Sequence, residues 1–361
     1  MIFGDLALDC ITKLQPYVPG KPVEELEREL GISNIVKLAS NENPLGPSAS
    51  VLAAIDGASK ALSRYPDGNG FTLKTALAEK YQLDLEQITL GNGSNDVLEL
   101  IARAFVLPED EVLFSQYAFA VYPIVTQAIG AKSVIAPARD YGHDLQAMST
   151  LINQRTKLIF IANPNNPTGT YVAEKELEAF VQQVPEHTLV VIDEAYVEYG
   201  DGTVDTIGWL NKYANLIITR TFSKAYGLAG LRVGYALSHP EVADLLNRVR
   251  QPFNVNNLAL AAATTALKDN EYLAATKQLN NEGMAQLIAG FDELGLEYIP
   301  SKGNFITVDV NRNSEEVFAD LLRQGVIVRP VTNYGLPKHI RVSIGLPDEN
   351  ERFLDAMRKI L

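Results

Sequence analysis

The chain has 361 residues, of which 47% are hydrophobic and 21% charged, a composition typical of a globular protein of one or two domains. Its formal net charge of −13 argues against a nucleic-acid-binding or anionic-membrane surface, so any bound anion must be held by local cations and backbone N–H groups. No apolar stretch reaches the roughly 20 residues that span a bilayer.

The N-terminal residues lack the basic start and apolar run of a secretory signal, and Cys10 is the single cysteine. We therefore expect a cytoplasmic chain without internal disulfides. Next, the segment PVEELEREL (22–30) has the spacing of a short amphipathic helix. We expect this helix to pack on a smaller domain or on a partner subunit.

The segment GNGSNDVLEL (91–100) is a glycine-rich turn that opens a helix, with Gly93, Ser94 and Asn95 at the start. Free N–H groups and the helix dipole favour an anion such as phosphate at this position. Many helices begin in this way without a ligand, so the motif alone leaves both interpretations open.

Short apolar runs then alternate with helical patterns, which predicts an α/β fold with a mostly parallel sheet of the seven-stranded type, flanked by helices. We expect this large domain at residues 38–255. The runs that we interpret as strands are 112–115, 157–163, 189–195, 215–224 and 231–237.

Two polar motifs follow buried runs of this sheet. In ANPNNPTGT (162–170), prolines and a glycine enforce a turn that presents the amide of Asn166 at the carboxyl end of a strand. In LVVIDEAYVEY (189–199), Asp193 ends an apolar run and Tyr196 follows three residues later. A carboxylate in that position needs a partner, which is either the cap of the next helix or a cationic ligand group.

The motif TRTFSKAYGLAGLRVGY (219–235) places Lys224 after another apolar strand. A lysine beside a hydrophobic wall and a second cation has a lowered pKa, which suits attachment to an aldehyde. Ser223 and Arg232 supply a hydroxyl and a guanidinium that suit a phosphate. A Ser-Lys pair alone is most often a surface feature, and the downstream glycine and arginine spacing makes the functional interpretation the stronger one.

The C-terminal part changes character. Residues 257–294 predict long helices, and short strands separated by helices follow them. We expect a smaller α+β domain made of residues 1–37 and 256–361.

Together the motifs match different atoms of one molecule, pyridoxal phosphate. Its aldehyde suits Lys224, and its ring nitrogen suits Asp193. Its phenolate oxygen suits Tyr196 and Asn166. Its phosphate suits the turn and loop residues Gly93, Ser94, Asn95, Ser223 and Arg232. We predict no metal site.

The pattern N-P-x-N-P-T-G, then D-E-A-Y, then S-K-x-x-x-L-A-G-x-R-x-G resembles the class I and II aminotransferases of fold type I. The resemblance covers essentially the whole chain. Its terminal segments look more narrowly like the histidinol-phosphate aminotransferases. These segments are PYVPGKPVEELERELG (16–31), KLASNENPLGPS (37–48), RYPDGNG (64–70) and VIVRPVTNYGLPKHIRVSIG (326–345).

The resemblance implies transfer of an amino group between glutamate or 2-oxoglutarate and histidinol phosphate or its ketone. It also implies a homodimer in which Tyr65 reaches the cofactor phosphate of the neighbouring subunit, and it places Phe119 against the cofactor ring. Arg341, with Asn166, would hold a substrate carboxylate. Arg329 and Tyr17 would face the distal phosphate.

Three alternatives stay open on sequence grounds. An aromatic amino-acid aminotransferase and a threonine-phosphate decarboxylase share the same cofactor motifs. The cofactor-binding part of a transcription regulator is disfavoured, because the recognisable fold begins near residue 16 and the chain is acidic.

Overall fold

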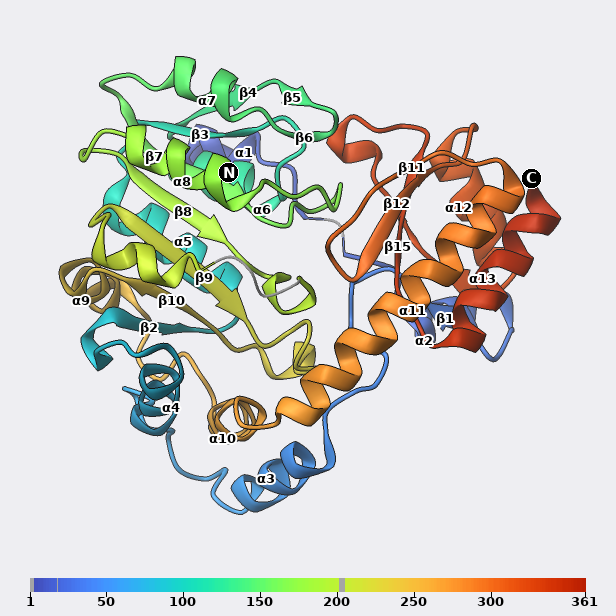
Figure 1. The fold of residues 1–361 in the computed structure, drawn as a ribbon, viewed down its shortest axis with the longest axis horizontal. Coiled ribbons are helices and arrows are strands. Elements are labelled where there is room, and N and C mark those ends of the chain that lie inside the picture. The colour runs from blue at the N-terminus through green and yellow to red at the C-terminus, as the bar shows by residue number, and fades with distance from the viewer. Residues whose placement is uncertain (1–2, 18, 201–204) are drawn as a thin grey trace.

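The computed structural model describes residues 3–17, 19–200 and 205–361. The described chain forms a larger lobe around one wide sheet and a smaller lobe around a narrow one (Figure 1). Figure 1 shows the long helix α11 (Asn270–Leu294) running between the two lobes. Among the described residues, none of the helices combines the length and hydropathy needed to cross a bilayer.

The larger lobe contains a seven-stranded sheet in which β10 is antiparallel to both of its neighbours, and the remaining pairs are parallel. In spatial order the strands are β2 (Ile88–Gly91), β10 (Gly234–Ser238), β9 (Leu216–Thr221), β8 (Leu189–Asp193), β7 (Thr156–Ala162), β3 (Glu111–Ser115) and β4 (Lys132–Ala136). The predicted mostly parallel α/β sheet is confirmed.

The central strands are apolar throughout because both faces of the sheet are covered. In β7, Ile159 and Ile161 pack on one face while Leu158 and Phe160 pack on the other, as the two-residue period of a strand requires. The helices of this lobe are α1 (Asp9–Thr12), α3 (Ala49–Ser59), α4 (Phe71–Tyr81), α5 (Ser94–Phe105), α6 (Val121–Ala128), α7 (Leu145–Leu151), α8 (Glu174–Gln183), α9 (Pro240–Val249) and α10 (Asn257–Ala266).

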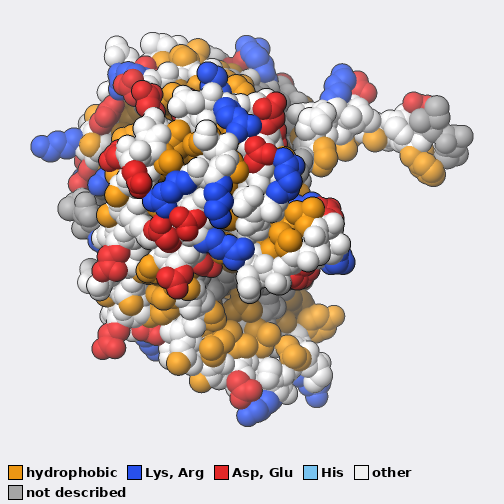
Figure 2. Space-filling model, turned by 90° about the vertical axis from the view of Figure 1, so that its right-hand side faces the viewer, with side chains coloured by type: hydrophobic (Ala, Val, Ile, Leu, Met, Phe, Trp, Pro, Cys, Tyr) orange, Lys and Arg blue, Asp and Glu red, His pale blue; other side chains and the backbone are white. Residues whose placement is uncertain are grey.

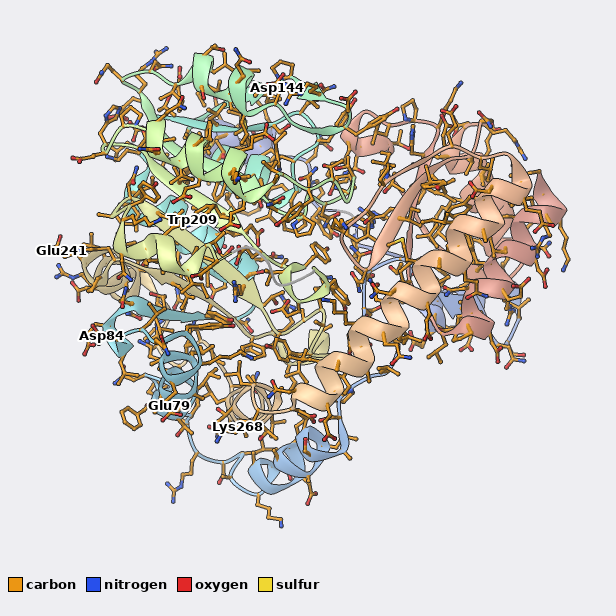
Figure 3. All side chains as sticks on the ribbon, in the orientation of Figure 1. Glu79, Asp84, Asp144, Trp209, Glu241 and Lys268 are labelled. Atoms are coloured by element: carbon orange, nitrogen blue, oxygen red, sulfur yellow. The ribbon has the colours of Figure 1, made fainter. Side chains whose placement is uncertain are left out.

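Side chains of α4, α7, α8 and α10 share one core with the sheet, and those of α5, α6 and α9 share the other. Trp209 belongs to the first core and lies inside the larger lobe, whereas Asp84 and Glu241 lie at its outer edge (Figure 3). Asp144 caps α7 by accepting a 3.0 Å hydrogen bond from the Ala147 N–H. A small hairpin of β5 (Ala138–Arg139) and β6 (Gly142–His143) precedes this helix.

The smaller lobe contains the antiparallel sheet β11 (Tyr298–Ile299), β12 (Phe305–Asp309), β15 (His339–Ser343) and β14 (Arg329–Pro330). Its helices are α2 (Val23–Leu30), α11, α12 (Ser314–Arg323) and α13 (Pro347–Ile360). The described residues also form the short 3-10 helices η1 (Phe3–Leu6), η2 (Leu85–Gln87), η3 (Val197–Tyr199), η4 (Ile207–Asn211), η5 (Ala229–Leu231) and η6 (Thr332–Tyr334).

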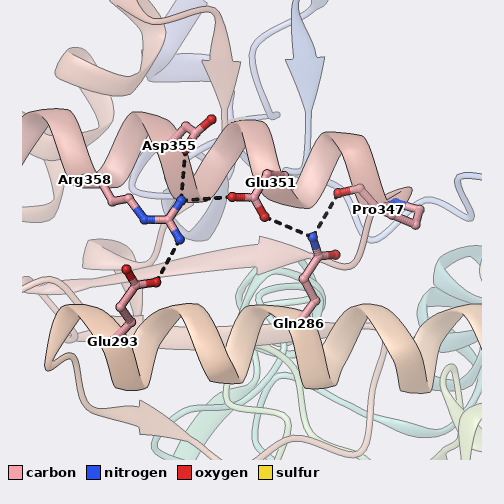
Figure 4. Close-up of polar contacts among 6 residues, drawn as sticks. All are labelled: Gln286, Glu293, Pro347, Glu351, Asp355 and Arg358. Atoms are coloured by element: carbon pink, nitrogen blue, oxygen red, sulfur yellow. Dashed lines mark hydrogen bonds and ion pairs between the residues drawn. The ribbon is translucent and has the colours of Figure 1, made fainter.

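Polar contacts bind α11 to α13 along their exposed faces (Figure 4). Arg358 contacts Glu293 of α11 and Glu351 of its own helix, each at 2.9 Å. Gln286 donates to the Pro347 carbonyl at 3.0 Å. These solvated contacts contribute little stability individually, and the buried core between the helices, which includes Phe291 and Phe353, contributes more.

The smaller lobe is assembled from both ends of the chain. The N-terminal strand β1 (Val36–Lys37) pairs in parallel with β13 (Val326–Ile327), and α2 lies beside them (Figure 1). The boundary between the two domains that the sequence places after residue 255 stays a prediction. Since Ala259, Ala262 and Ala263 of α10 pack in the larger lobe's core, we propose a boundary within α11.

Candidate active site

One cavity of about 170 Å³ lies between the carboxyl ends of the central strands of the larger lobe and strand β15 of the smaller one. Open α/β sheets bind ligands at this end of their strands. The cavity is lined by the predicted site residues Tyr17, Ser94, Asn95, Phe119, Asn166, Asp193, Tyr196, Ser223, Lys224, Arg232, Arg329 and Arg341. The two remaining candidates, Gly93 and Tyr65, do not line it.

Lys224 lies in the loop after β9 and points its amine into the cavity. Its Nζ donates to the Ser40 carbonyl at 2.9 Å and lies 5.8 Å from the centre of the Tyr196 ring. Burial, reinforced by the positive charge of Arg341, lowers the pKa of Lys224 to about 7. A substantial fraction of this amine is therefore neutral near pH 7, which makes it available as a nucleophile or a base.

Asp193 ends strand β8 and is 4% exposed. Its two carboxylate oxygens accept hydrogen bonds from Tyr122 at 2.9 Å and from Thr219 at 3.1 Å. Burial raises the pKa of Asp193 to about 6, although both hydrogen bonds act in the opposite direction. A cationic group in the cavity would restore the carboxylate to its ionised form.

The Tyr196 hydroxyl accepts hydrogen bonds from two side-chain amides, Asn41 at 2.9 Å and Asn166 at 3.2 Å. Burial raises the pKa of Tyr196 to about 12, so the phenol is neutral at physiological pH. Phe119 is half-buried at the cavity wall and contacts the ring of Tyr122 edge-on, with centroids 5.8 Å apart.

A cradle for an anion forms where α5 begins. Gly93 caps the helix with φ +85°, and Ser94 is the first helical residue. The Arg232 guanidinium closes the cradle so tightly that a Cβ on Gly93 would lie 2.3 Å from one of its nitrogens. Arg232 also donates to the Ser223 hydroxyl at 3.2 Å. Helix N–H groups, hydroxyls and a guanidinium are the groups that hold a phosphate, so the residues fit the predicted cofactor.

Two more arginines meet the cavity from the smaller lobe. Arg341 is 7% exposed. It donates to the side-chain oxygen Oδ1 of Asn166 at 2.6 Å and to the backbone carbonyl of Ala39 at 2.7 Å. Its buried Nε has no hydrogen-bond partner among the described residues. The guanidinium of Arg329 lies 5.5 Å from the centre of the Tyr17 ring, a cation–π geometry.

Tyr65 is 81% exposed and stacks on Phe253, with ring centroids 4.7 Å apart. Within one chain it therefore lies apart from the cavity. Sequence reasoning assigned no definite role to Tyr122 or to Asn41. The apolar segment around Tyr122 offered no local signal, because the bond to Asp193 spans 71 positions.

The sequence model of the family described as aminotransferase class I and II matches residues 33–357. A histidinol-phosphate aminotransferase 2 of Pseudomonas fluorescens (strain Pf0-1) is 62% identical over 99% of this chain and 98% of its own length. A histidinol-phosphate aminotransferase 1 of Nitrosococcus oceani is 56% identical over 100% of this chain and 98% of its own.

Among solved structures, the histidinol-phosphate aminotransferase of Sinorhizobium meliloti in complex with pyridoxal-5'-phosphate superposes with a TM-score of 0.90. It is 30% identical, and the match covers 98% of each chain. An aspartate aminotransferase of Thermus thermophilus shares the fold at a TM-score of 0.86 and 22% identity, over 98% of this chain and 99% of its own. These matches confirm the predicted fold type I, and the chain belongs to the class I and II aminotransferases, grouping with relatives named histidinol-phosphate aminotransferase over its whole length.

Proposed function

We propose that the chain is a pyridoxal-phosphate-dependent aminotransferase of histidine biosynthesis. It moves an amino group between glutamate or 2-oxoglutarate and histidinol phosphate or imidazole-acetol phosphate. The observation that carries the proposal is the convergence of one amine, one buried carboxylate and three arginines on a single cavity: Lys224, Asp193, Arg232, Arg329 and Arg341. The shared name of relatives at 56% and 62% identity supports this substrate pair.

When bound, pyridoxal phosphate supplies an aldehyde and an electron-withdrawing ring that stabilises negative charge on the amino-bearing carbon of the substrate. Arg232, Ser223 and the N-terminus of α5 would hold the phosphate. Asp193 would pair with the ring nitrogen, and this ion pair would keep the nitrogen protonated and the carboxylate ionised. Phe119, at the cavity wall, would supply an apolar surface for the ring.

Lys224 performs the proton transfers. Its Nζ would hold the cofactor through the aldehyde in the resting enzyme. As a free amine, Lys224 would accept the proton from the amino-bearing carbon of the substrate. A pKa of about 7 suits this role, because a fully solvated lysine is almost entirely protonated at neutral pH and has no lone pair to offer.

The two arginines of the smaller lobe bind the substrate anions. Arg341 offers a buried guanidinium whose Nε is still unpartnered among the described residues. Arg329, together with Tyr17, offers a second cation at the cavity wall. Glutamate carries two carboxylates and histidinol phosphate carries one phosphate and no carboxylate. We therefore propose that Arg341 binds a carboxylate in one half-reaction and a phosphate in the other.

We further propose a homodimer with shared active sites. Large apolar side chains are exposed in and beside α3, at Leu45, Leu52 and Leu62, and at Phe253, on which Tyr65 stacks. An exposed surface of this kind is typical of a subunit interface. Figure 2 shows hydrophobic side chains gathered in the lower part of the view, where Figure 1 places α3, whereas charges of both signs mix on the smaller lobe. A cytoplasmic location stays a prediction.

The test is a half-reaction scan of the purified protein loaded with pyridoxal phosphate. Borohydride reduction followed by peptide mapping is expected to label Lys224. Histidinol phosphate and glutamate are expected to change the cofactor absorbance. A response to phenylalanine but not to histidinol phosphate would favour the aromatic aminotransferase, and release of carbon dioxide from threonine phosphate would favour the decarboxylase.

A further inference from the structure

Two amides donate to the same phenolic oxygen at the centre of the site. Asn41 and Asn166 each direct an Nδ2 hydrogen at the Tyr196 hydroxyl, at 2.9 and 3.2 Å. A phenol has one proton and a limited capacity to accept hydrogen bonds. With both amides donating, the Tyr196 proton is turned away from them and is available to an acceptor in the cavity.

Ser343 fixes which way the Asn41 amide points. The Ser343 hydroxyl accepts from the Asn41 backbone N–H at 2.8 Å and donates to Asn41 Oδ1 at 3.0 Å. Because a hydroxyl has one proton to donate, this bond places the amide oxygen at Ser343 and leaves Nδ2 for Tyr196. Asn41 is 1% exposed, and Asn304 also donates to its backbone carbonyl at 2.9 Å.

The side-chain amide of Asn166 is oriented in a similar way, by Arg341. Arg341 donates to Asn166 Oδ1 at 2.6 Å, so the nitrogen of that amide also faces Tyr196. Arg341 and Ser343 are two residues apart on β15 and project from the same side of the strand. One strand of the smaller lobe therefore orients both amides.

Arg341 and Ser343, which orient the two amides, differ in their exposure to substrate. Arg341 lines the cavity, and a bound anion competes with Asn166 for its guanidinium. Ser343 lies behind Asn41, outside the cavity lining. The hydrogen bond from Asn41 to Tyr196 therefore keeps its geometry in each half-reaction, whereas a substrate anion can disturb the hydrogen bond from Asn166 to Tyr196.

We propose that Ser343 and Asn41 are positioning residues that hold the Tyr196 hydroxyl as a donor toward the ring oxygen of the cofactor. This inference rests on the proposed function, since only bound pyridoxal phosphate presents that oxygen. A donated hydrogen bond stabilises negative charge on the ring oxygen and makes the neighbouring nitrogen, which Lys224 contributes, less basic. Losing the donor makes this nitrogen more basic.

Several charges act on the same nitrogen, so a test must compare variants that leave them in place. The charged side chains that act on the Lys224 amine are Arg341, Glu42, Arg232 and Lys37, and Asp193 also lines the cavity. Ser343→Ala alters none of them. Ser343→Thr retains the hydroxyl. Ser314→Ala removes another fully buried hydroxyl of the smaller lobe, which contacts Thr332 instead, and is the matched control.

The experiment is an absorbance titration of the loaded protein against pH, which reports the midpoint for protonation of the nitrogen joined to Lys224. Ser343→Ala is expected to raise this midpoint by about half a unit to one unit. Ser343→Thr and Ser314→Ala are expected to leave it unchanged. Asn41→Gly is a second variant that removes the amide, and glycine accepts the φ of 54° found at this position. It is expected to shift the midpoint in the same direction.

A double substitution separates positioning from a general structural effect. In a Tyr196→Phe background, Ser343→Ala is expected to produce no further shift, because the hydroxyl through which it acts is gone. A shift of equal size in both backgrounds, or no shift in Ser343→Ala and Asn41→Gly, would overturn the proposal. If unaltered protein takes no borohydride label at Lys224, the proposed function fails instead.

Discussion

Tyr122 of helix α6 donates a 2.9 Å hydrogen bond to Asp193 at the end of strand β8. The Tyr122 ring is fully buried and stacks on Phe160, with centroids 4.5 Å apart and planes 6° from parallel. Thr219 donates to the other carboxylate oxygen at 3.1 Å. The carboxylate is therefore held in one orientation by two neutral donors, and its charge is left for a ligand.

Replacing Tyr122 by phenylalanine keeps the ring stack and removes one donor. We expect the pKa of Asp193 to rise further from about 6, because a hydrogen bond to the ionised form is lost. Affinity for pyridoxal phosphate is expected to fall about tenfold, the effect of one hydrogen bond to a charged group. Titrating apoprotein with cofactor measures this. Tyr235→Phe is the control, since that buried hydroxyl contacts Tyr81, and equal affinities for Tyr122→Phe and unaltered protein would contradict the role.

The close contact between Gly93 and Arg232 predicts that alanine substitutions at Gly93 and at Gly230 differ sharply in their effect on cofactor affinity. Gly93→Ala places a Cβ 2.3 Å from an Arg232 nitrogen at φ +85°, so Arg232 must move from the phosphate position. We expect cofactor affinity to fall by at least about tenfold. Gly230→Ala, in the same loop as Arg232, meets nothing within 4 Å and is expected to bind normally. Equal dissociation constants for the two variants would show that the cradle does not hold the phosphate.

Arg341 is proposed to serve both substrates, and Arg341→Ala tests this directly. We expect kcat/KM to fall on the order of 100-fold for glutamate and for histidinol phosphate, since each loses a buried ionic contact. Arg329→Ala is the comparison, and its loss is expected to be larger for histidinol phosphate than for glutamate. Unchanged kinetics of Arg341→Ala with histidinol phosphate would mean that the two anions bind at separate places.

The lowered pKa of Lys224 predicts a pH dependence of stability in the cofactor-free protein. In the unfolded chain this lysine keeps its proton up to about pH 10.5, whereas in the folded chain it loses the proton near pH 7. Between these values the unfolded state binds more protons, so Lys224 makes the free energy of unfolding rise with pH. Urea unfolding at pH 7, 8 and 9 measures the slope. Lys224→Met is expected to reduce it and Lys268→Met, a change at an exposed lysine, to leave it unchanged.

The shared site of the proposed homodimer is tested by mixing two inactive variants. Tyr65→Ala and Lys224→Ala are each expected to lose most activity. Refolding them together yields mixed dimers with one site that contains both residues, so about a quarter of the normal activity is expected to return. If mixed dimers form and no activity returns, Tyr65 does not complete a site across the interface.

Local patterns were sufficient for strands β3, β7, β8, β9 and β10 and for several residues that meet in the cavity, whereas the edge strand β4 was not among the predicted runs. Lys224 and Asp193 each follow a buried apolar run, and the carboxyl ends of parallel strands meet at one edge, so their proximity follows from the sequence. The same argument found Asn166, whereas Ser94 was predicted from the glycine-rich turn that opens a helix.

Contacts between distant segments could not be predicted in this way. Ser343 and Asn41 are 302 positions apart, and their bond depends on how the N-terminal segment packs against the sheet that the C-terminal part forms. The alanine-rich periodicity of α10 does not say which sheet the helix covers, and in the structure this helix packs in the core of the larger lobe. Such choices are decided by packing over the whole chain.

The pairing of Val36 with Val326 has a consequence for biogenesis. The last strand of the larger lobe's sheet, β10, ends at Ser238 and the last helix of its core, α10, ends at Ala266, so that lobe can fold during translation before the C-terminal strands of the smaller lobe are made. The smaller lobe needs β1 as well as the segment from β11 to α13, and it is completed only after that segment has been made. Since Arg329 and Arg341 arrive with it, a nascent chain can form a cofactor pocket before it has any means to bind substrate.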